Sequence, residues 1–152
     1  MAAIIIGITG SIAAYKTYDL IRGLRKSGYE VTCVLTAAAE HFISPLVLQQ
    51  FTGRKVYREM FDRADWEIEH IALAQKAAVV AVIPATANII GKLANGIADD
   101  LLSTLLLAVR CPILIAPAMN ETMYLHPAVQ LNITVLKQRG CSFIGPDKGE
   151  LA

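Results

Sequence analysis

The chain has 152 residues, of which 55% are hydrophobic and 18% are charged. This length and apolar content suit one compact domain with a substantial core, so we expect a single domain over residues 1–152. The formal net charge is +1 and no cluster of Lys and Arg stands out, which argues against a nucleic-acid-binding protein.

Two apolar runs are too short or too interrupted to span a membrane. Residues 2–8 lack a basic leading segment and a small-residue cleavage site, so they suit a buried strand better than a signal peptide. Residues 101–109 contain Ser103 and Thr104 and reach about half the length of a membrane-spanning helix. We therefore expect a cytoplasmic protein that does not bind membranes.

The cysteines do not form a pattern typical of disulfides or zinc. Cys33, Cys111 and Cys141 are odd in number, widely spaced and set among apolar residues. We expect three reduced thiols in the core and no metal site.

The first predicted element is a strand that leads into a glycine turn. Residues 2–8 form a β-branched run typical of a strand buried on both faces of a parallel sheet. Residues 7–13 then read Gly-x-x-Gly-x-x-Ala, and helical spacing continues over residues 14–26. Such turns bind phosphate through backbone N–H groups. Because the spacing departs from the dinucleotide-binding pattern Gly-x-Gly-x-x-Gly, a tight turn without a ligand is an equal alternative.

A second strand and two short helices follow. Residues 30–35 are predicted to be a strand, and Thr36 is either the N-cap of residues 37–42 or a phosphate or ribityl contact at the same sheet edge. A serine and a proline then begin a helix over residues 45–51. The charged residues 54–69 indicate a surface loop.

His70 begins the helix that is predicted to lead into the third strand. Taken alone, a single histidine is more often structural than catalytic, and His41 and His126 have no further support for a catalytic role. The residue pattern by itself leaves both roles open for His70.

The segment after the third strand is the one around which we expect the site to be built. A strand at residues 78–83 ends in residues 84–88 (Pro-Ala-Thr-Ala-Asn), a run of small residues with hydroxyl and amide groups. In an open α/β sheet, such a run lines the ligand crevice at the carboxyl ends of the strands.

A helix that is apolar on nearly every face is predicted at residues 101–109. Asp99 or Asp100 is expected to be its N-cap, which is a simpler explanation than a metal-binding or acid–base pair. Because such a helix must be buried on all sides, we expect a subunit interface and a homo-oligomer.

The last predicted elements are a strand, a helix and a strand at residues 112–117, 127–139 and 142–144. Asn120 follows the fourth strand, where it can cap a helix or hold a carboxylate through its amide. The alternation of strands and helices predicts an α/β fold with one doubly wound parallel sheet, of the Rossmann-like or flavodoxin-like type.

Four motifs, taken together, match one known family. They are Gly7–Lys16 (GITGSIAAYK), His70 before Ile71, Pro84–Asn88 (PATAN) with its continuation to Ser103 (GKLANGIADDLLS), and Pro117–Met123 (PAMNETM). In this order they resemble the flavin-dependent cysteine decarboxylase family, in particular its branch in coenzyme A synthesis. The resemblance covers nearly the whole chain.

The resemblance implies an FMN site at the edge of the sheet in a homotrimer or a dodecamer. The implied cofactor-binding residues are Gly10, Ser11, Thr36, Pro84, Ala85, Thr86, Asn88 and Ser103. His70 matches the family's active-site histidine, which we expect to act as a general base. Asn120 and Met119 match the motif that binds the substrate carboxylate.

The implied reaction is decarboxylation of 4'-phosphopantothenoylcysteine to 4'-phosphopantetheine. FMN oxidises the thiol carbon, the resulting thioaldehyde supports loss of CO₂, and the enethiol is then reduced. A phosphopantothenoylcysteine synthetase, fused or separate, is the expected partner.

The family's proton-donating cysteine lies in a Gly-Glu flap motif, and here residues 149–152 are Gly-Glu-Leu-Ala. We therefore expect the domain formed by residues 1–152 to lack the C-terminal part of the substrate flap. Three alternatives stay open: a peptidyl-cysteine oxidative decarboxylase, a flavin prenyltransferase-like protein and a non-catalytic flavin-binding regulatory subunit. His70 and the motif at residues 117–120 argue against the prenyltransferase. Tyr124 stands where relatives usually have tryptophan, and Ala78 where aspartate is common.

Overall fold

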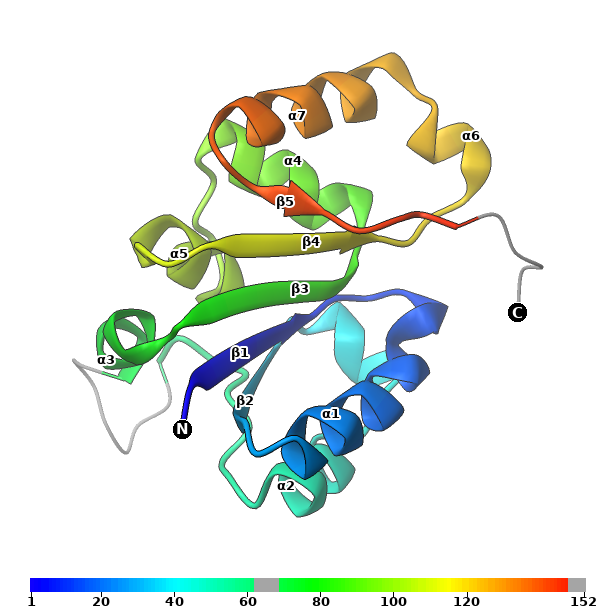
Figure 1. The fold of residues 1–152 in the computed structure, drawn as a ribbon. Helices are drawn as coiled ribbons and strands as arrows, with labels where there is room; N and C mark the ends of the chain where they lie inside the picture. The colour runs from blue at the N-terminus through cyan, green and yellow to red at the C-terminus, as the bar shows by residue number, and fades with distance from the viewer. Residues whose placement is uncertain (62–68, 148–152) are drawn as a thin grey trace.

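The computed structural model describes residues 1–61 and 69–147, apart from the side chains of Glu69 and His70. Five parallel strands form one sheet in the order β2-β1-β3-β4-β5 (Figure 1). The strands are β1 (Ala3–Ile8), β2 (Glu30–Leu35), β3 (Val79–Ala85), β4 (Ile113–Pro117) and β5 (Ser142–Phe143). The predicted doubly wound α/β fold is confirmed, with the flavodoxin-like strand order.

Helices connect the strands close to the predicted positions. They are η1 (Ile12–Lys16), α1 (Thr17–Lys26), η2 (Ala38–His41), α2 (Pro45–Thr52), α3 (Glu69–Lys76), α4 (Ala87–Asn95), α5 (Leu101–Ala108), α6 (Glu121–Tyr124) and α7 (Pro127–Gln138). Ser44 caps α2 and Asp100 caps α5 through their side-chain oxygens. The predicted loops at residues 54–69 and 145–152 are described only in part, because residues 62–68 and 148–152 lie outside the described residues.

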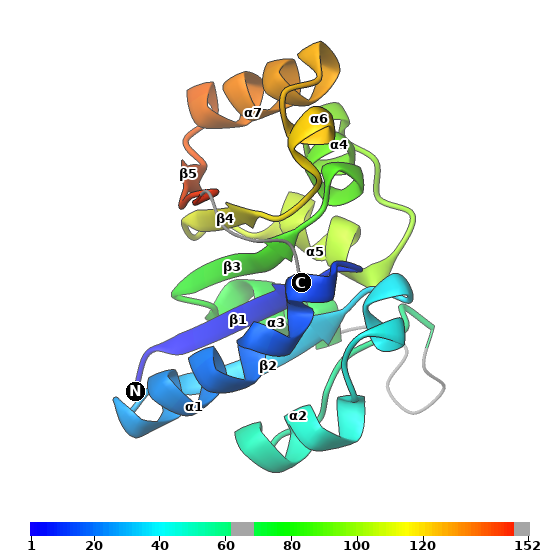
Figure 2. The same cartoon turned by 90° about the vertical axis from the view of Figure 1, so that its right-hand side faces the viewer.

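Helices pack on both faces of the sheet. On one face, α1 and α2 belong to a cluster that contains Ile6 and Ile8 of β1. On the other, α3, α4, α5 and α7 belong to a cluster that contains Val82 of β3 and Ile115 of β4. Figure 2 shows these two helical layers with the sheet between them. Alternate residues of each strand therefore serve opposite cores, as expected for a parallel sheet buried on both faces.

The apolar helix α5 is buried mainly by its own chain. Leu101, Leu102, Leu105 and Leu106 are each at most 5% exposed, whereas Leu107 is 47% exposed. The core of one chain thus explains most of the pattern from which we expect a subunit interface, so the homo-oligomer stays a prediction. Within the described part of the chain, no helix has both the length and the apolar character needed to cross a membrane.

All three cysteines are free, as expected, but they differ in burial. Cys33 is fully buried in β2, and this burial raises the pKa of its thiol to about 12. Cys111 and Cys141 precede β4 and β5 and are half-buried, and burial raises the pKa of both thiols. The prediction of a core position is therefore fully met by Cys33 alone, since the other two lie where the chain approaches its strands.

Two glycines near the end of α1 differ in backbone conformation but not in their surroundings. A Cβ at Gly23 or at Gly28 would meet no atom within 4 Å. Gly28 has a φ of +86°, which an L side chain rarely adopts, whereas the φ of Gly23, inside the helix, is not positive. Substitutions at these two positions therefore differ in the backbone conformation that the new side chain meets, and not in the atoms around it.

We expect Gly23→Ala to raise the free energy of unfolding by about 0.5–1 kcal/mol, because alanine has the higher helix propensity. Gly28→Ala should lower it by about 1–2 kcal/mol, because of the left-handed backbone. Urea denaturation of the two variants beside the wild type measures both changes. The same sign of change in both variants would contradict this assignment.

The burial of the thiols predicts an order of reaction. With an aromatic disulfide reagent at pH 8, Cys111 and Cys141 should react in the folded protein, and Cys33 only after unfolding, because only the ionised and accessible thiol reacts. Absorbance of the released thiolate and peptide mapping by mass spectrometry give the order. Labelling of Cys33 in the folded protein at the rate of Cys111 would contradict the structure.

Candidate functional site

Loops that follow four parallel strands lie along one edge of the sheet. The N–H of Thr36 donates to the carbonyl of Ile8 at 3.1 Å, and the N–H of Ala118 donates to the carbonyl of Ala85 at 3.0 Å. These bonds join the ends of neighbouring strands, so the loops begin side by side. We call this region the carboxyl edge; it comprises residues 9–11, 36–38, 84–88 and 118–120. Most of the predicted site residues lie on it.

The strand order reverses at the middle of this edge. The chain passes from β1 to β2 on one side, and from β3 to β4 and β5 on the other. The register between β1 and β3 ends at the pair Gly7 and Val82. Doubly wound proteins bind ligands where the strand order reverses, outside the carboxyl ends of the strands. The carboxyl edge is therefore the candidate site.

Gly10 is required by close contact between the loops after β1 and β2. A Cβ at Gly10 would lie 2.5 Å from the Cβ of Ala38 and 3.1 Å from its carbonyl carbon. Any larger residue would push the two loops apart. Ser11, the next residue, caps η1, because its Oγ accepts a hydrogen bond from the N–H of Ala13 at 3.3 Å. Its hydroxyl proton can still be donated to a ligand oxygen.

Thr86 is the N-cap of α4, and the hydroxyl of Thr36 bonds to the start of η2. Oγ1 of Thr36 accepts from the N–H of Ala39, and Oγ1 of Thr86 accepts from the N–H of Ile89, each at 3.3 Å. The prediction of Thr36 as the N-cap is wrong by one residue: Ala37 is the N-cap of η2, and Thr36 supports the start of this helix from the preceding position. Because such a hydroxyl can still donate its proton, a ligand contact by either threonine is compatible with this geometry and stays a prediction.

The segment 84–88 contains the last two residues of β3, the N-cap Thr86 and the first two residues of α4, and it changes from buried to exposed along its length. Pro84 and Ala85 are buried, Thr86 is half-buried and Asn88 is exposed. Thr9, which sequence analysis does not single out, bonds this segment from β1. Its Oγ1 donates to the carbonyl of Pro84 at 2.6 Å and accepts from the N–H of Thr86 at 3.0 Å. The one sequence signal for it is a hydroxyl residue between a strand and a turn glycine.

A polar network surrounds the start of α5. Ser103 is 1% exposed, and its Oγ lies 2.6 Å from Oδ1 of Asp100 and 3.1 Å from the N–H nitrogen of that residue. Nζ of Lys92 lies 2.8 Å from Oδ1 of Asp99, and this hydrogen bond holds the pKa of Asp99 below its usual range. No group of three metal-ligating side chains occurs among the described residues. Asp100 is thus the cap, and a ligand contact by Ser103 would have to compete with this network.

Asn120 lies at the end of β4 with a free donor group. Its Oδ1 caps α6 by accepting from the N–H of Thr122 at 2.8 Å. Its Nδ2 group has no hydrogen-bond partner in the described part of the chain and can donate to a carboxylate. Met119 beside it is half-buried and packs partly against the core. The capping role of Asn120 is confirmed, and its contact with a carboxylate stays a prediction with which this geometry is compatible.

The histidines occupy three different settings. His70 is in the first turn of α3, and its side chain lies outside the described residues. His126 has a structural contact, because its Nδ1 accepts from the N–H of Ala128 at 3.1 Å and caps α7. His41 is exposed at the end of η2.

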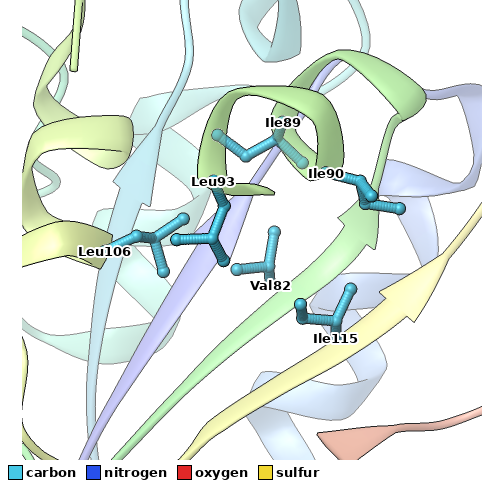
Figure 3. Close-up of a pocket in the computed structure, with 6 residues that line it drawn as sticks. All are labelled: Val82, Ile89, Ile90, Leu93, Leu106 and Ile115. Carbon is cyan, nitrogen blue, oxygen red and sulfur yellow. The ribbon is translucent and has the colours of Figure 1, made fainter. Parts of the chain in front are cut away.

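A pocket between α4, α5 and the sheet is separate from the carboxyl-edge side chains. It has no room for a water molecule, and it is lined by Val82, Ile89, Ile90, Leu93, Leu106 and Ile115 (Figure 3). All six side chains are aliphatic and offer no hydrogen bond. It is a gap in the core rather than a site for a phosphorylated cofactor.

A known protein family matches this chain over its whole length. The family model described as Flavoprotein matches residues 1–152. The Coenzyme A biosynthesis bifunctional protein CoaBC of Haemophilus influenzae is 48% identical over 147 residues, which make up 96% of this chain and 37% of that protein. The chain thus spans little more than a third of the length of this curated relative.

Two solved structures are similar over nearly the whole chain. The FMN-dependent cysteine decarboxylase SpaF matches with a TM-score of 0.92 and 34% identity, over 98% of this chain and 86% of its own. A PPC decarboxylase mutant complexed with pantothenoylaminoethenethiol matches with a TM-score of 0.85 and 29% identity, over 99% of this chain and 85% of its own. Sequence and fold agree that the chain belongs to the Flavoprotein family.

Proposed function

We propose that this chain catalyses the FMN-dependent decarboxylation of 4'-phosphopantothenoylcysteine to 4'-phosphopantetheine, a step of coenzyme A synthesis. The proposal is carried by the carboxyl edge, where three motifs far apart in the sequence supply neighbouring loops at the reversal of strand order. The 48% identity with a coenzyme A biosynthesis protein supports this choice of substrate.

The residues of the carboxyl edge suit FMN. Gly10 lets the loops after β1 and β2 pack closely together, and the hydroxyls of Ser11 and Thr36 retain protons for phosphate oxygens. The accessible part of the segment 84–88, residues 86–88, offers a short, uncharged surface with the hydroxyl of Thr86 and the amide of Asn88. When bound, FMN supplies reversible hydride acceptance at the thiol-bearing carbon of the substrate.

Within this proposal His70 and Asn120 act on the cysteine part of the substrate. His70 removes a proton as general base, the role that histidine most often takes in enzymatic proton transfer. Nδ2 of Asn120 donates to the substrate carboxylate and orients it. Because this amide is neutral, it avoids the strong ground-state stabilisation that a cation would give to the carboxylate that must leave as CO₂. Over the whole reaction a C–C bond breaks, and a proton takes the place of CO₂ on carbon.

A second candidate is oxidative decarboxylation of a cysteine at a peptide C-terminus, ending at the enethiol. One observation favours it. The fold similarity is slightly higher to a peptidyl-cysteine decarboxylase, with a TM-score of 0.87, than to the PPC decarboxylase mutant at 0.85. The identity with CoaBC favours the first candidate.

The proposal includes a homo-oligomer, either a trimer or a dodecamer, in the cytoplasm. Apolar side chains exposed on η1 and α2 support an interface, with Ile12 54%, Tyr15 51% and Leu46 67% exposed. Three free thiols suit a reducing compartment. The word bifunctional in the relative's name supports a synthetase partner, fused or separate.

CO₂ release tests the substrate choice. The chain loaded with FMN should release CO₂ faster from 4'-phosphopantothenoylcysteine than from a cysteine-ended peptide. His70→Asn should keep a flavin absorption spectrum and lose CO₂ release by about 10²–10⁴-fold, as for loss of a general base. Preference for the peptide would favour the second candidate. Inactivity on both substrates with flavin bound would indicate a regulatory subunit, and full activity of His70→Asn would remove His70 from the mechanism.

Asn120→Asp separates the two roles of this residue. Aspartate is as good an N-cap as asparagine, so the variant should fold with wild-type stability. It replaces the free amide donor with a carboxylate that repels the substrate carboxylate, so kcat/KM should fall by about tenfold or more. Steady-state kinetics and urea denaturation measure both effects. Unchanged kinetics at unchanged stability would leave Asn120 as a cap alone.

A further inference from the structure

The strands β1 and β3 lose their backbone pairing just before the candidate site. Their register ends at Gly7 and Val82, although β3 continues to Ala85. Pro84 has no N–H to donate to a neighbouring strand. Backbone bonds continue on the outer sides, from Thr36 to Ile8 and from Ala118 to Ala85. Beyond Gly7 and Val82, a hydrogen bond between β1 and β3 therefore has to involve a side chain instead of two backbone groups.

Thr9 supplies that side chain. It donates to the carbonyl of Pro84 at 2.6 Å and accepts from the N–H of Thr86 at 3.0 Å, so one hydroxyl joins two successive backbone positions of the segment 84–88. These contacts link residues 75 and 77 positions apart in the chain. Thr9 is 1% exposed, so water does not readily replace either bond if the hydroxyl is removed.

Thr9 is itself held from the other side. The next residue, Gly10, lies so close to Ala38 that a Cβ there would be 2.5 Å from the Cβ of Ala38. The turn after β1 is thus fixed against the loop after β2, and it carries Thr9 to the segment after β3. In contrast, among the described residues the hydroxyls of Ser11 and Thr86 bond only to the starts of their own helices.

We propose that Thr9 is a positioning residue for the cofactor site: its hydroxyl sets the path of residues 84–88, and so the surface that this segment presents at the carboxyl edge. The inference rests on the proposed function, in which this segment contacts FMN. Thr9 itself is buried behind the segment and is not assigned a contact with FMN or substrate.

Thr9→Val tests the inference, because valine has nearly the shape of threonine but neither donates nor accepts. Thr9→Ser keeps the hydroxyl. Thr52→Val is the matched control, since Thr52 is also 1% exposed and its Oγ1 donates to the carbonyl of Leu48 at 2.9 Å and accepts from the N–H of Arg54 at 3.2 Å. Thr52 is the last residue of α2, at the opposite end of that helix from its N-cap Ser44.

The whole chain is titrated with FMN by quenching of flavin fluorescence, and the stability of the unloaded protein is measured by urea denaturation. Thr9→Val should raise the Kd for FMN by about tenfold or more and change the visible circular dichroism of bound flavin, whereas Thr9→Ser should stay within about twofold of the wild type. Thr52→Val should lose stability with an unchanged Kd. Thr9→Ala, which adds no methyl group beside the Pro84 carbonyl, replaces Thr9→Val if the latter does not fold.

A Thr9→Val or Thr9→Ala protein with the wild-type Kd would overturn the inference. So would an equal rise of Kd in Thr52→Val, because the effect would then follow from lost stability in general. A wild-type chain that binds no FMN would overturn the proposed function instead, so the two failures are distinct.

Discussion

The parting of β1 and β3 is the feature on which the candidate site depends. All neighbouring strands of the sheet are parallel, so their carboxyl ends share one edge, and the strand order reverses between these two strands. Connections leave β1 and β3 in opposite directions, and no helix connection covers the point between them. In such a sheet the two strands are joined by backbone hydrogen bonds up to the last paired residues, and the loops beyond them diverge.

Several residues at this point are small, and their hydroxyl groups can serve two purposes. Gly10 allows two loops to touch, and the hydroxyls of Ser11, Thr36 and Thr86 hold the first N–H groups of the helices that follow. Each of these hydroxyls keeps a proton for a ligand. The same atoms can therefore stabilise the local structure and bind an anionic cofactor, which explains why capping and binding interpretations of these residues are not exclusive.

Local patterns predicted the strands, most of the helices and the caps at Ser44 and Asp100, because a strand, a turn glycine or an N-cap is defined by residues within one or two turns of one another. They did not reveal Thr9, whose partners are 75 and 77 positions away. They also left open what buries α5, since an apolar helix has the same pattern whether its own core or another subunit covers it. Ser103 was assigned to FMN by resemblance, and its bonds to Asp100 depend on a local geometry that residue types alone do not give.

A crystal structure of the chain with FMN tests the central claim most directly. The account predicts that the flavin lies on the carboxyl edge against residues 84–88, with the phosphate near Gly10 and Ser11, and with the side chains of His70 and Asn120 facing one shared hollow beside the ring. A flavin bound elsewhere, or His70 and Asn120 on separate surfaces of the chain and of any assembly it forms, would contradict it.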